Sequence, residues 1–251
     1  MSMSQLAKQI DEEIIYPDSD GQPMADNTKQ FDWINHIVSN LRTQYIHDPN
    51  VFIAGDLLWY PIEGDNKTRR APDAMVAFGR PKGHRGSYKQ WLEDNIAPQV
   101  VFEIRSPGNK NSEMEEKFQF YQDYQVEEYY LYDPDTGQLK GWIRGGGQLR
   151  PIVSMNGWKS QRLGIHFKLK DKELSLYHPN GKPFTTHDEE AKRAEEEAKA
   201  RQAEKRRADA EAKARQVEKQ RAESAEAQLA RLQSLLAQKG ISLEEILING
   251  Q

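Results

Sequence analysis

The chain has 251 residues, with 39 acidic and 35 basic side chains and a formal net charge of −4. It contains no cysteine, which excludes disulfide frameworks, thiolate zinc sites and cysteine nucleophiles. No apolar run approaches the ~18 residues that a membrane span needs, and the N-terminus lacks the basic and apolar regions of a signal peptide. We therefore expect a cytoplasmic protein that does not enter a membrane.

The first part of the chain predicts a leader, a helix and one or two strands. Residues 1–27 read as an irregular leader, rich in turn-forming residues. A helix is expected next, capped by Asn27 or Thr28. Its apolar residues recur at three-and-four spacing, namely Phe31, Ile34, Ile37, Val38 and Leu41. Residues 51–62 then alternate like one strand, or like two that are broken near Gly55-Asp56.

The middle of the chain predicts a mixed α/β arrangement. Ser112 and Glu115 predict a capping box at the start of a helix, and the glycines at 145–147 predict a hairpin turn. The expected elements are strands over residues 71–79 and 98–108, a helix over 112–125, and strands over 127–134, 138–144, 148–154, 166–169 and 174–177. This order indicates an α/β or α+β domain with a mixed sheet, which we expect to span residues 28–186.

Residues 187–239 are nearly all Ala, Glu, Lys, Arg and Gln, with no Gly or Pro, which is the profile of a long helix or coiled coil. Acids four residues before bases stabilise such a helix by ~0.2–0.5 kcal/mol per pair. A heptad seam occurs only late, at Ala222, Ala225, Leu229, Leu232 and Leu236. Assembly into a homo-oligomer, through this helix or through the core, is therefore left open. Residues 240–251 predict a short terminal helix after Gly240.

Two carboxylates occupy unusual positions. Asp73 follows Pro72 at the start of an apolar strand, and Glu103 lies inside another one. Burying an ionised carboxylate is costly without a compensating partner. One such acid is readily explained as structural, but two on successive strands ~4.8 Å apart could share a Mg²⁺ ion, which prefers hard oxygen ligands.

Candidate cations accompany these acids. Arg105 follows Glu103 by two residues and so projects from the same face of the strand. Lys117 belongs to the apolar stripe of the next helix, where it either snorkels past the core edge, which spacing alone slightly favours, or points at the acids. A basic segment also surrounds Asp73, as a solvated loop or as a phosphate-binding surface. It comprises Lys67, Arg69, Arg70, Arg80, Lys82, Arg85 and Lys89.

Four segments together resemble the Uma-two family of restriction-endonuclease-like proteins, within the PD-(D/E)XK nuclease superfamily. They are Ala71-Pro72-Asp73, Glu103 to Pro107, Lys117 with Tyr121, and residues 128–134. The resemblance runs from about Tyr16 to Phe184. Residues 79–91 are similar to the family's basic connection between two core strands.

The resemblance implies a restriction-endonuclease-like core that hydrolyses DNA phosphodiester bonds with Mg²⁺, or with Mn²⁺ in its place. Asp73, Glu103 and the backbone carbonyl of Ile104 would hold the metal, and Lys117 would be the catalytic cation. Arg105, Ser106 and the basic segment would contact phosphates.

The sequence departs from the superfamily pattern in two places. Arg105 stands where a lysine is usual, and an arginine can stabilise an anion but cannot act as a base. The family's upstream glutamate is missing, and Asp18 or Asp20 could replace it. These departures support an alternative, a catalytically weak nuclease fold that serves as a binding or scaffold module through its tail.

Overall fold

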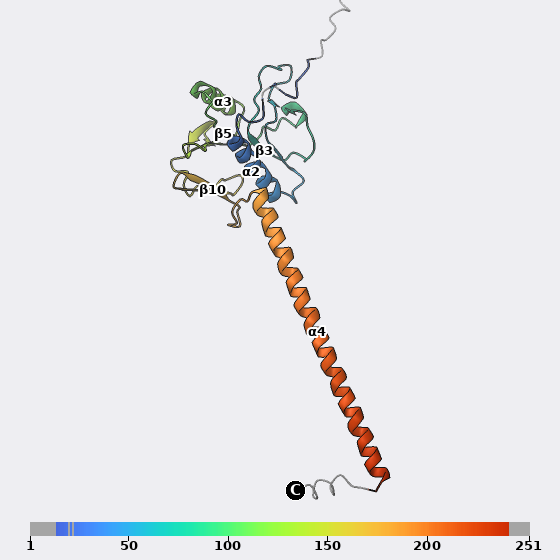
Figure 1. Cartoon of the computed structure of the whole chain (residues 1–251). Coiled ribbons are helices and arrows are strands. Elements are labelled where there is room, and N and C mark those ends of the chain that lie inside the picture. The colour runs from blue at the N-terminus through green and yellow to red at the C-terminus, as the bar shows by residue number, and fades with distance from the viewer. Residues whose placement is uncertain (1–13, 20, 22, 241–251) are drawn as a thin grey trace, which may run out of the picture. The chain divides into compact units, whose positions relative to one another are not determined.

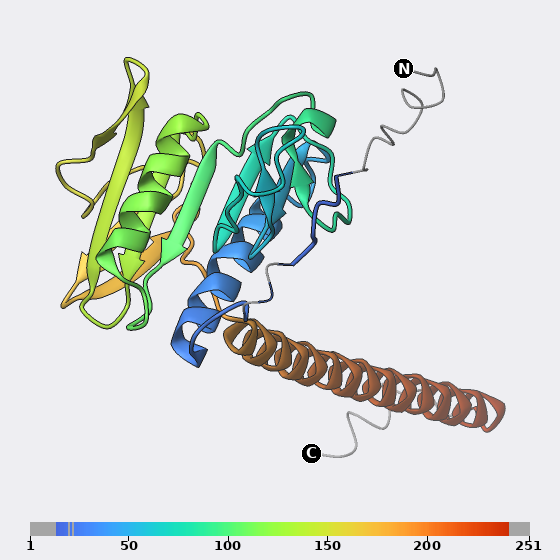
Figure 2. The same ribbon diagram turned by 90° about the horizontal axis from the view of Figure 1, so that it is seen from above.

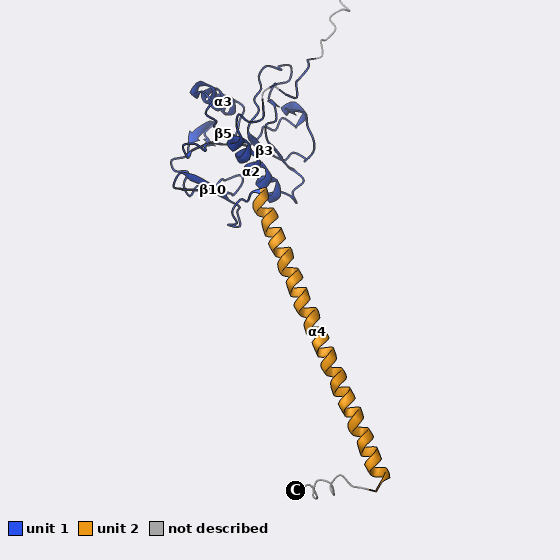
Figure 3. Cartoon of the chain, in the orientation of Figure 1, with its two compact units in different colours: residues 1–186 blue, residues 187–251 orange. Residues whose placement is uncertain are grey.

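The computed structural model describes residues 14–19, 21 and 23–240. The chain divides into two compact units, residues 1–186 and 187–251 (Figure 3). Within the described residues, no helix is both long and apolar enough to cross a membrane.

Helix α2 spans Thr28–Gln44, as expected, and Asn27 caps it by accepting a hydrogen bond from the Gln30 amide at 2.9 Å. One position of its predicted apolar face is wrong. Phe31 is 44% exposed, whereas Gln30 is buried. The buried stripe therefore runs through Gln30, Ile34, Ile37, Val38 and Leu41. The first residue of the face that packs on the sheet is thus polar.

The main sheet has six strands in the order β1-β3-β5-β6-β7-β8. Their bounds are β1 Val51–Ala54, β3 Ala74–Phe78, β5 Val100–Ile104, β6 Glu128–Asp133, β7 Gln138–Gly145 and β8 Gln148–Pro151. Strands β5 and β6 are parallel, and all other neighbours are antiparallel. Helix α3, Asn111–Asp123, makes the crossover that a parallel pair requires. The expected mixed sheet with flanking helices is confirmed.

Helices α2 and α3 cover opposite faces of this sheet (Figures 1 and 2). Alternate residues of β5 join different cores, since Val100, Phe102 and Ile104 pack with α2, and Val101 packs with α3. The hairpin of β9 (His166–Lys170) and β10 (Glu173–Tyr177) adds to the core on the α2 face.

Short elements complete the domain. Strand β2, Trp59–Tyr60, pairs in parallel with β4, Tyr88–Lys89, and the 3-10 helix η1 follows at Gln90–Leu92. Residues 51–62 are thus two strands, broken near Gly55 as the sequence suggests. The predicted capping box of α3 is wrong, because the helix begins at Asn111 and its N-cap, Lys110, makes no side-chain capping bond.

Gly55 sets how closely α2 approaches the sheet beside Asp73. A Cβ atom at this position would lie 3.1 Å from Val38 Cγ2, 3.2 Å from the Asp73 carbonyl oxygen and 3.3 Å from Ile34 Cγ2. Glycine therefore permits a backbone approach that any larger residue would push apart. Gly55 therefore lies close both to α2 and to Asp73, the residue just before β3.

The second unit consists of α4, His187–Gln238, a 52-residue helix with no buried residue. Its exposed surface is stabilised by pairs such as Glu195–Lys199 and Glu211–Arg215, each with a nitrogen–oxygen distance of 2.6 Å. Gly240 adopts a left-handed conformation with φ of 68° just beyond the helix. The short helix expected after it, within residues 241–251, lies outside the described residues.

Candidate active site

The register of β3 and β5 brings the two unusual acids together. Ala74 pairs with Phe102, and continuing this antiparallel register by one residue places Asp73 opposite Glu103. Both acids project toward α3, because Asp73 is in phase with Met75 and Glu103 is in phase with Val101. Their exposed fractions are 6% and 1%, so the pair is nearly closed to bulk water.

Helix α3 supplies two partners for Glu103. Lys117 Nζ lies 2.8 Å from Glu103 Oε2, and the Tyr121 hydroxyl donates to Glu103 Oε1. Lys117 and Tyr121 are four residues apart and therefore share one helix face. The structure thus brings Asp73, Glu103 and Lys117 to one place, with the lysine pointing at the acids instead of snorkelling. Tyr121 is part of this group, although the sequence assigned it no role at the site.

Gln30 is a further member that the sequence analysis missed. Its Nε2 donates to the carbonyl oxygen of Ile104 at 2.9 Å, and its Oε1 accepts from the Asp26 amide at 2.8 Å. Asp73 Oδ2 accepts from the Ile104 amide at 2.6 Å, and the Gln30 side chain acts to lower the pKa of Asp73. The one available signal was its spacing, four residues before Ile34 on the apolar stripe of α2.

The site holds two buried carboxyl groups and one largely buried amino group. Burial, followed by the neighbouring Glu103 carboxylate, raises the pKa of Asp73 well above its ordinary value. Burial disfavours the Lys117 ammonium, but the charges of Glu103 and Asp73 outweigh this effect and raise the pKa of Lys117. Lys117 therefore stays protonated at neutral pH. Two carboxylates facing one ammonium leave the site suited to a further cation.

The donor set fits a hard divalent cation. Carboxylate oxygens accept two bonds each, and a backbone carbonyl also has two lone pairs, so the hydrogen bonds described above leave acceptor capacity on Asp73, Glu103 and the Ile104 carbonyl. Within residues 14–19, 21 and 23–240, no third acid or histidine joins the pair to make a cluster of three. Of the two acids suggested as replacements for the upstream glutamate, Asp20 lies outside the described residues. The Asp18 carboxylate lies so close to Gly86 that a Cβ atom on residue 86 would collide with it.

The residues after Glu103 are engaged differently. Arg105 Nη2 donates to Asn111 Oδ1 at 2.6 Å, which leaves its charge without an ion-pair partner in the described part of the chain. Ser106 is buried, and its hydroxyl donates to Asp26. The Ser106 hydroxyl therefore ties β5 to the segment before α2 rather than facing outward toward a phosphate.

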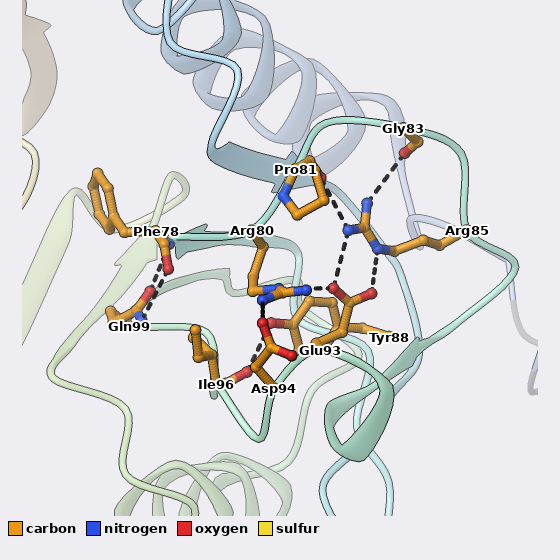
Figure 4. Close-up of polar contacts among 10 residues, drawn as sticks. All are labelled: Phe78, Arg80, Pro81, Gly83, Arg85, Tyr88, Glu93, Asp94, Ile96 and Gln99. Carbon is orange, nitrogen blue, oxygen red and sulfur yellow. Dashed lines mark hydrogen bonds and ion pairs between the residues drawn. The ribbon is translucent and has the colours of Figure 1, made fainter.

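Three members of the basic segment serve the fold. Arg80 and Arg85 converge on Glu93 from two sides, with nitrogen–oxygen distances of 3.0 and 2.5 Å, and Arg80 also pairs with Asp94 (Figure 4). The side chains of both arginines are only 11% and 13% exposed. Lys82 Nζ donates to the carbonyls of Tyr45 and Ile46 just beyond α2, where a cation complements the helix dipole.

The other members of the basic segment are half-buried or exposed. Arg70 pairs with exposed Glu116 of α3 at 3.1 Å, and Arg69 lies 5.9 Å from the Tyr60 ring. Lys89 lies 5.2 Å from the Tyr16 ring, and Lys67 is exposed. Phosphate contact stays a prediction for these residues.

Replacing Glu93 by Gln should destabilise the domain at neutral pH by about 1.5–3 kcal/mol, the usual range for hydrogen bonds to a charged group. Burial alone would raise the pKa of Glu93, but Arg85 and Arg80 outweigh it and lower this pKa. A lowered carboxyl pKa stabilises the fold above the ordinary glutamate value, near pH 4.3, and loses this effect as the pH falls through the folded-state pKa. Urea unfolding of both proteins between pH 7 and pH 3 should show the difference shrinking.

Asp94→Asn is the matched control for this experiment. Asp94 pairs with the same Arg80, but its side chain is 78% exposed, so the cost should stay below about 1 kcal/mol. A Glu93→Gln effect that is constant with pH would contradict the charge-based explanation.

The domain is thus a mixed α/β fold with an acid–lysine site on the α3 face of its sheet. The family model described as "Uma2: Putative restriction endonuclease" matches residues 4–179. The chain therefore belongs to this family.

Among solved structures, the chain is similar to one described as a "putative nuclease belonging to DUF820 from Anabaena variabilis". The two are 16% identical with a TM-score of 0.40, over 54% of this chain and 72% of that one. No curated protein matches the chain.

Proposed function

We propose that the protein is an Mg²⁺-dependent endonuclease that hydrolyses DNA phosphodiester bonds at the Asp73–Glu103 pair. The observation that carries this proposal is the meeting of two buried carboxylates and one protonated lysine on the α3 face of the sheet. Membership of a family described as restriction endonucleases supports the same reaction class.

Asp73, Glu103 and the Ile104 carbonyl would hold the ion. When bound, Mg²⁺ supplies a more acidic water molecule and neutralises charge on the scissile phosphate. Gln30 positions the Ile104 carbonyl through its 2.9 Å hydrogen bond. Tyr121 fixes the orientation of the Glu103 carboxylate.

Lys117 acts as a fixed positive charge and hydrogen-bond donor, because its raised pKa keeps it protonated. It would orient the attacking water and stabilise the charge that develops on the phosphate. Arg105, which has the same strand phase as Glu103, would contact a neighbouring phosphate.

Incubation of plasmid and single-stranded DNA with the full-length protein tests the proposal. We expect cleavage with Mg²⁺ or Mn²⁺, none with a chelator, and a loss of at least about 10²–10³-fold in Asp73→Ala. Full cleavage by a double alanine variant at Asp73 and Glu103 would exclude this site.

A second candidate function is a scaffold that assembles through α4. It is supported by leucines on that helix that stay largely exposed, Leu229 by 59% and Leu232 by 61%, since such residues commonly pair helices. Sedimentation of the full chain beside a chain ending at Thr186 tests it. An unchanged monomer mass would remove α4 as an assembly device.

A further inference from the structure

Beside the acid pair, the α3 face of the sheet continues in two rows of side chains. Strand pairing sets the neighbours within each row. From β3 to β7, one row holds Asp73, Glu103, Leu131 and Lys140, and the next holds Met75, Val101, Tyr129 and Trp142. Lys140 therefore lies in the row of the acids, two strands from Glu103 and on the order of 10 Å away.

A cavity of about 370 Å³ lies where these rows meet α3. Its lining includes Arg105, Phe118, Tyr129, Leu131, Lys140 and Trp142. The volume falls in the ~300–1,000 Å³ range of small-molecule sites. Because Leu131 stands between Glu103 and Lys140, the cavity begins one strand away from the acid pair. We call it the α3 pocket.

The charge of the α3 pocket suits a phosphate. Arg105, two residues beyond Glu103 on the chain, and Lys140, two strands from Glu103 on β7, both line this pocket, and neither is within 4 Å of an acidic group among the described residues. Glu115 is the one acid in the lining, so the net charge there is positive. Ionised donors of this kind make the stronger hydrogen bonds to phosphate oxygens.

The pocket also offers aromatic surface and an unused hydrogen-bonding group. The partly exposed Trp142 ring stacks on Tyr129 at 5.0 Å and 14°, and Phe118 lies 5.4 Å from Trp142. The Tyr129 residue is 1% exposed, yet its buried hydroxyl has no partner among the described residues. Core packing explains the Tyr129 ring, but it explains neither this hydroxyl nor the two cations without ion-pair partners that line the same pocket.

We propose that the α3 pocket binds one unpaired nucleotide of the substrate strand next to the cut, with its phosphate between Arg105 and Lys140 and its base against Trp142 and Phe118. This inference rests on the proposed function and narrows its substrate class. A base reaches such a pocket only after leaving its pair and stack. The substrate is therefore single-stranded or locally unpaired DNA, not a continuous duplex.

Binding of fluorescein-labelled DNA to full-length protein carrying Asp73→Asn, which removes cleavage, tests the proposal. The probes are a 12-nucleotide single strand, its perfect duplex and a duplex with one unpaired nucleotide, all at one salt concentration. We expect tighter binding of the two unpaired probes. Trp142→Leu should weaken that binding about tenfold, as expected for one stacking contact, and Lys140→Gln should weaken it about tenfold, as expected for one hydrogen bond to a charged group. Trp142→Phe should retain most of it, and Lys168→Gln, at an exposed position of β9, should change nothing.

Equal affinity for all three probes would overturn the proposal, and so would full affinity in Trp142→Leu. Thermal melting of each variant separates loss of binding from loss of folding, and Trp142→Phe supports the comparison if Trp142→Leu unfolds. Because binding is measured without cleavage, the two proposals fail separately. If the wild-type protein cuts no DNA but its binding depends on the pocket residues, the nuclease proposal is excluded and the α3-pocket proposal stands. If it cuts continuous duplex at a rate that neither pocket variant changes, the nuclease proposal stands and the α3-pocket proposal is excluded.

Discussion

Replacing Lys117 by Met is expected to destabilise the domain by about 3–5 kcal/mol in metal-free solution and to reduce cleavage by about 10²–10³-fold. The stability loss arises because Glu103, which is 1% exposed, would be left buried without its ion-pair partner, the ammonium 2.8 Å away. Removing one partner of a buried ion pair typically costs this much. In a domain of this size the melting temperature should fall by about 6–20 °C. The activity loss follows from removing a fixed donor at the reacting phosphate.

A double-mutant cycle with Asp73→Asn identifies the cause. Asp73→Asn alone removes a carboxyl whose pKa is raised first by burial and then by repulsion from Glu103, so its melting temperature should equal or exceed that of the wild type. In Asp73→Asn/Lys117→Met, the repulsion between the two acids is removed but Glu103 still lacks its ammonium partner, so only the part of the lost stability that comes from this repulsion should return. Added Mg²⁺ should stabilise Lys117→Met more than it stabilises the wild type.

Lys110→Met, at an exposed lysine just before α3, is the control and should have little effect. A double variant that is less stable than Lys117→Met would contradict this electrostatic account.

Replacing Glu128 by Ala is expected to destabilise the domain by about 3 kcal/mol or more, with a melting temperature lower by about 6–12 °C. Glu128 is 1% exposed at the start of β6 and accepts three hydrogen bonds. The donors are the Tyr130 hydroxyl at 2.8 Å, the Ser160 hydroxyl at 2.5 Å and the Arg162 amide at 2.8 Å. Alanine would leave these groups, which tie the segment before β9 to β6, without their acceptor.

Glu127→Ala is the natural control, since it removes the same side chain one residue earlier. Glu127 is 36% exposed and pairs with Arg162, which is 44% exposed, so its loss should cost less than about 1 kcal/mol. Differential scanning calorimetry of both variants provides the comparison. Because Glu128 makes its contacts on the α2 face of the sheet, folded Glu128→Ala should keep the wild-type cleavage rate at low temperature. A stability equal to that of Glu127→Ala would show that the three hydrogen bonds contribute little.

Periodicity predicted most of the fold, because burial of one face of an element imposes a visible repeat. The strand holding Val100 and Ile104 and the α2 stripe through Ile34 and Leu41 are examples. Strand β4 was missed because two residues are too short to show a period, and its pairing with β2 is decided by tertiary contacts. The capping box failed since α3 starts at Asn111, which places Ser112 inside the helix.

The candidate site was predictable where a residue type conflicts with its surroundings. Asp73 and Glu103 stand out because an acid in an apolar strand demands a partner. Gln30 does not stand out, since a polar residue near a helix start is ordinary. The engagement of Arg80 and Arg85 was hidden for another reason. Their main partner, Glu93, lies just beyond the basic segment and meets them only when the chain folds back through η1.

The internal neutralisation of that segment has a consequence for how the protein would respond to ionic strength. Of its seven basic side chains, Arg80, Lys82 and Arg85 are committed to carboxylates or backbone carbonyls. Each phosphate that a protein neutralises releases counterions and contributes about −0.9 to the slope of log affinity against log salt for duplex DNA. With three contacts withdrawn, association with a polyanion would decline more gently in rising salt than the composition of the segment suggests. Long-range capture would be slower for the same reason.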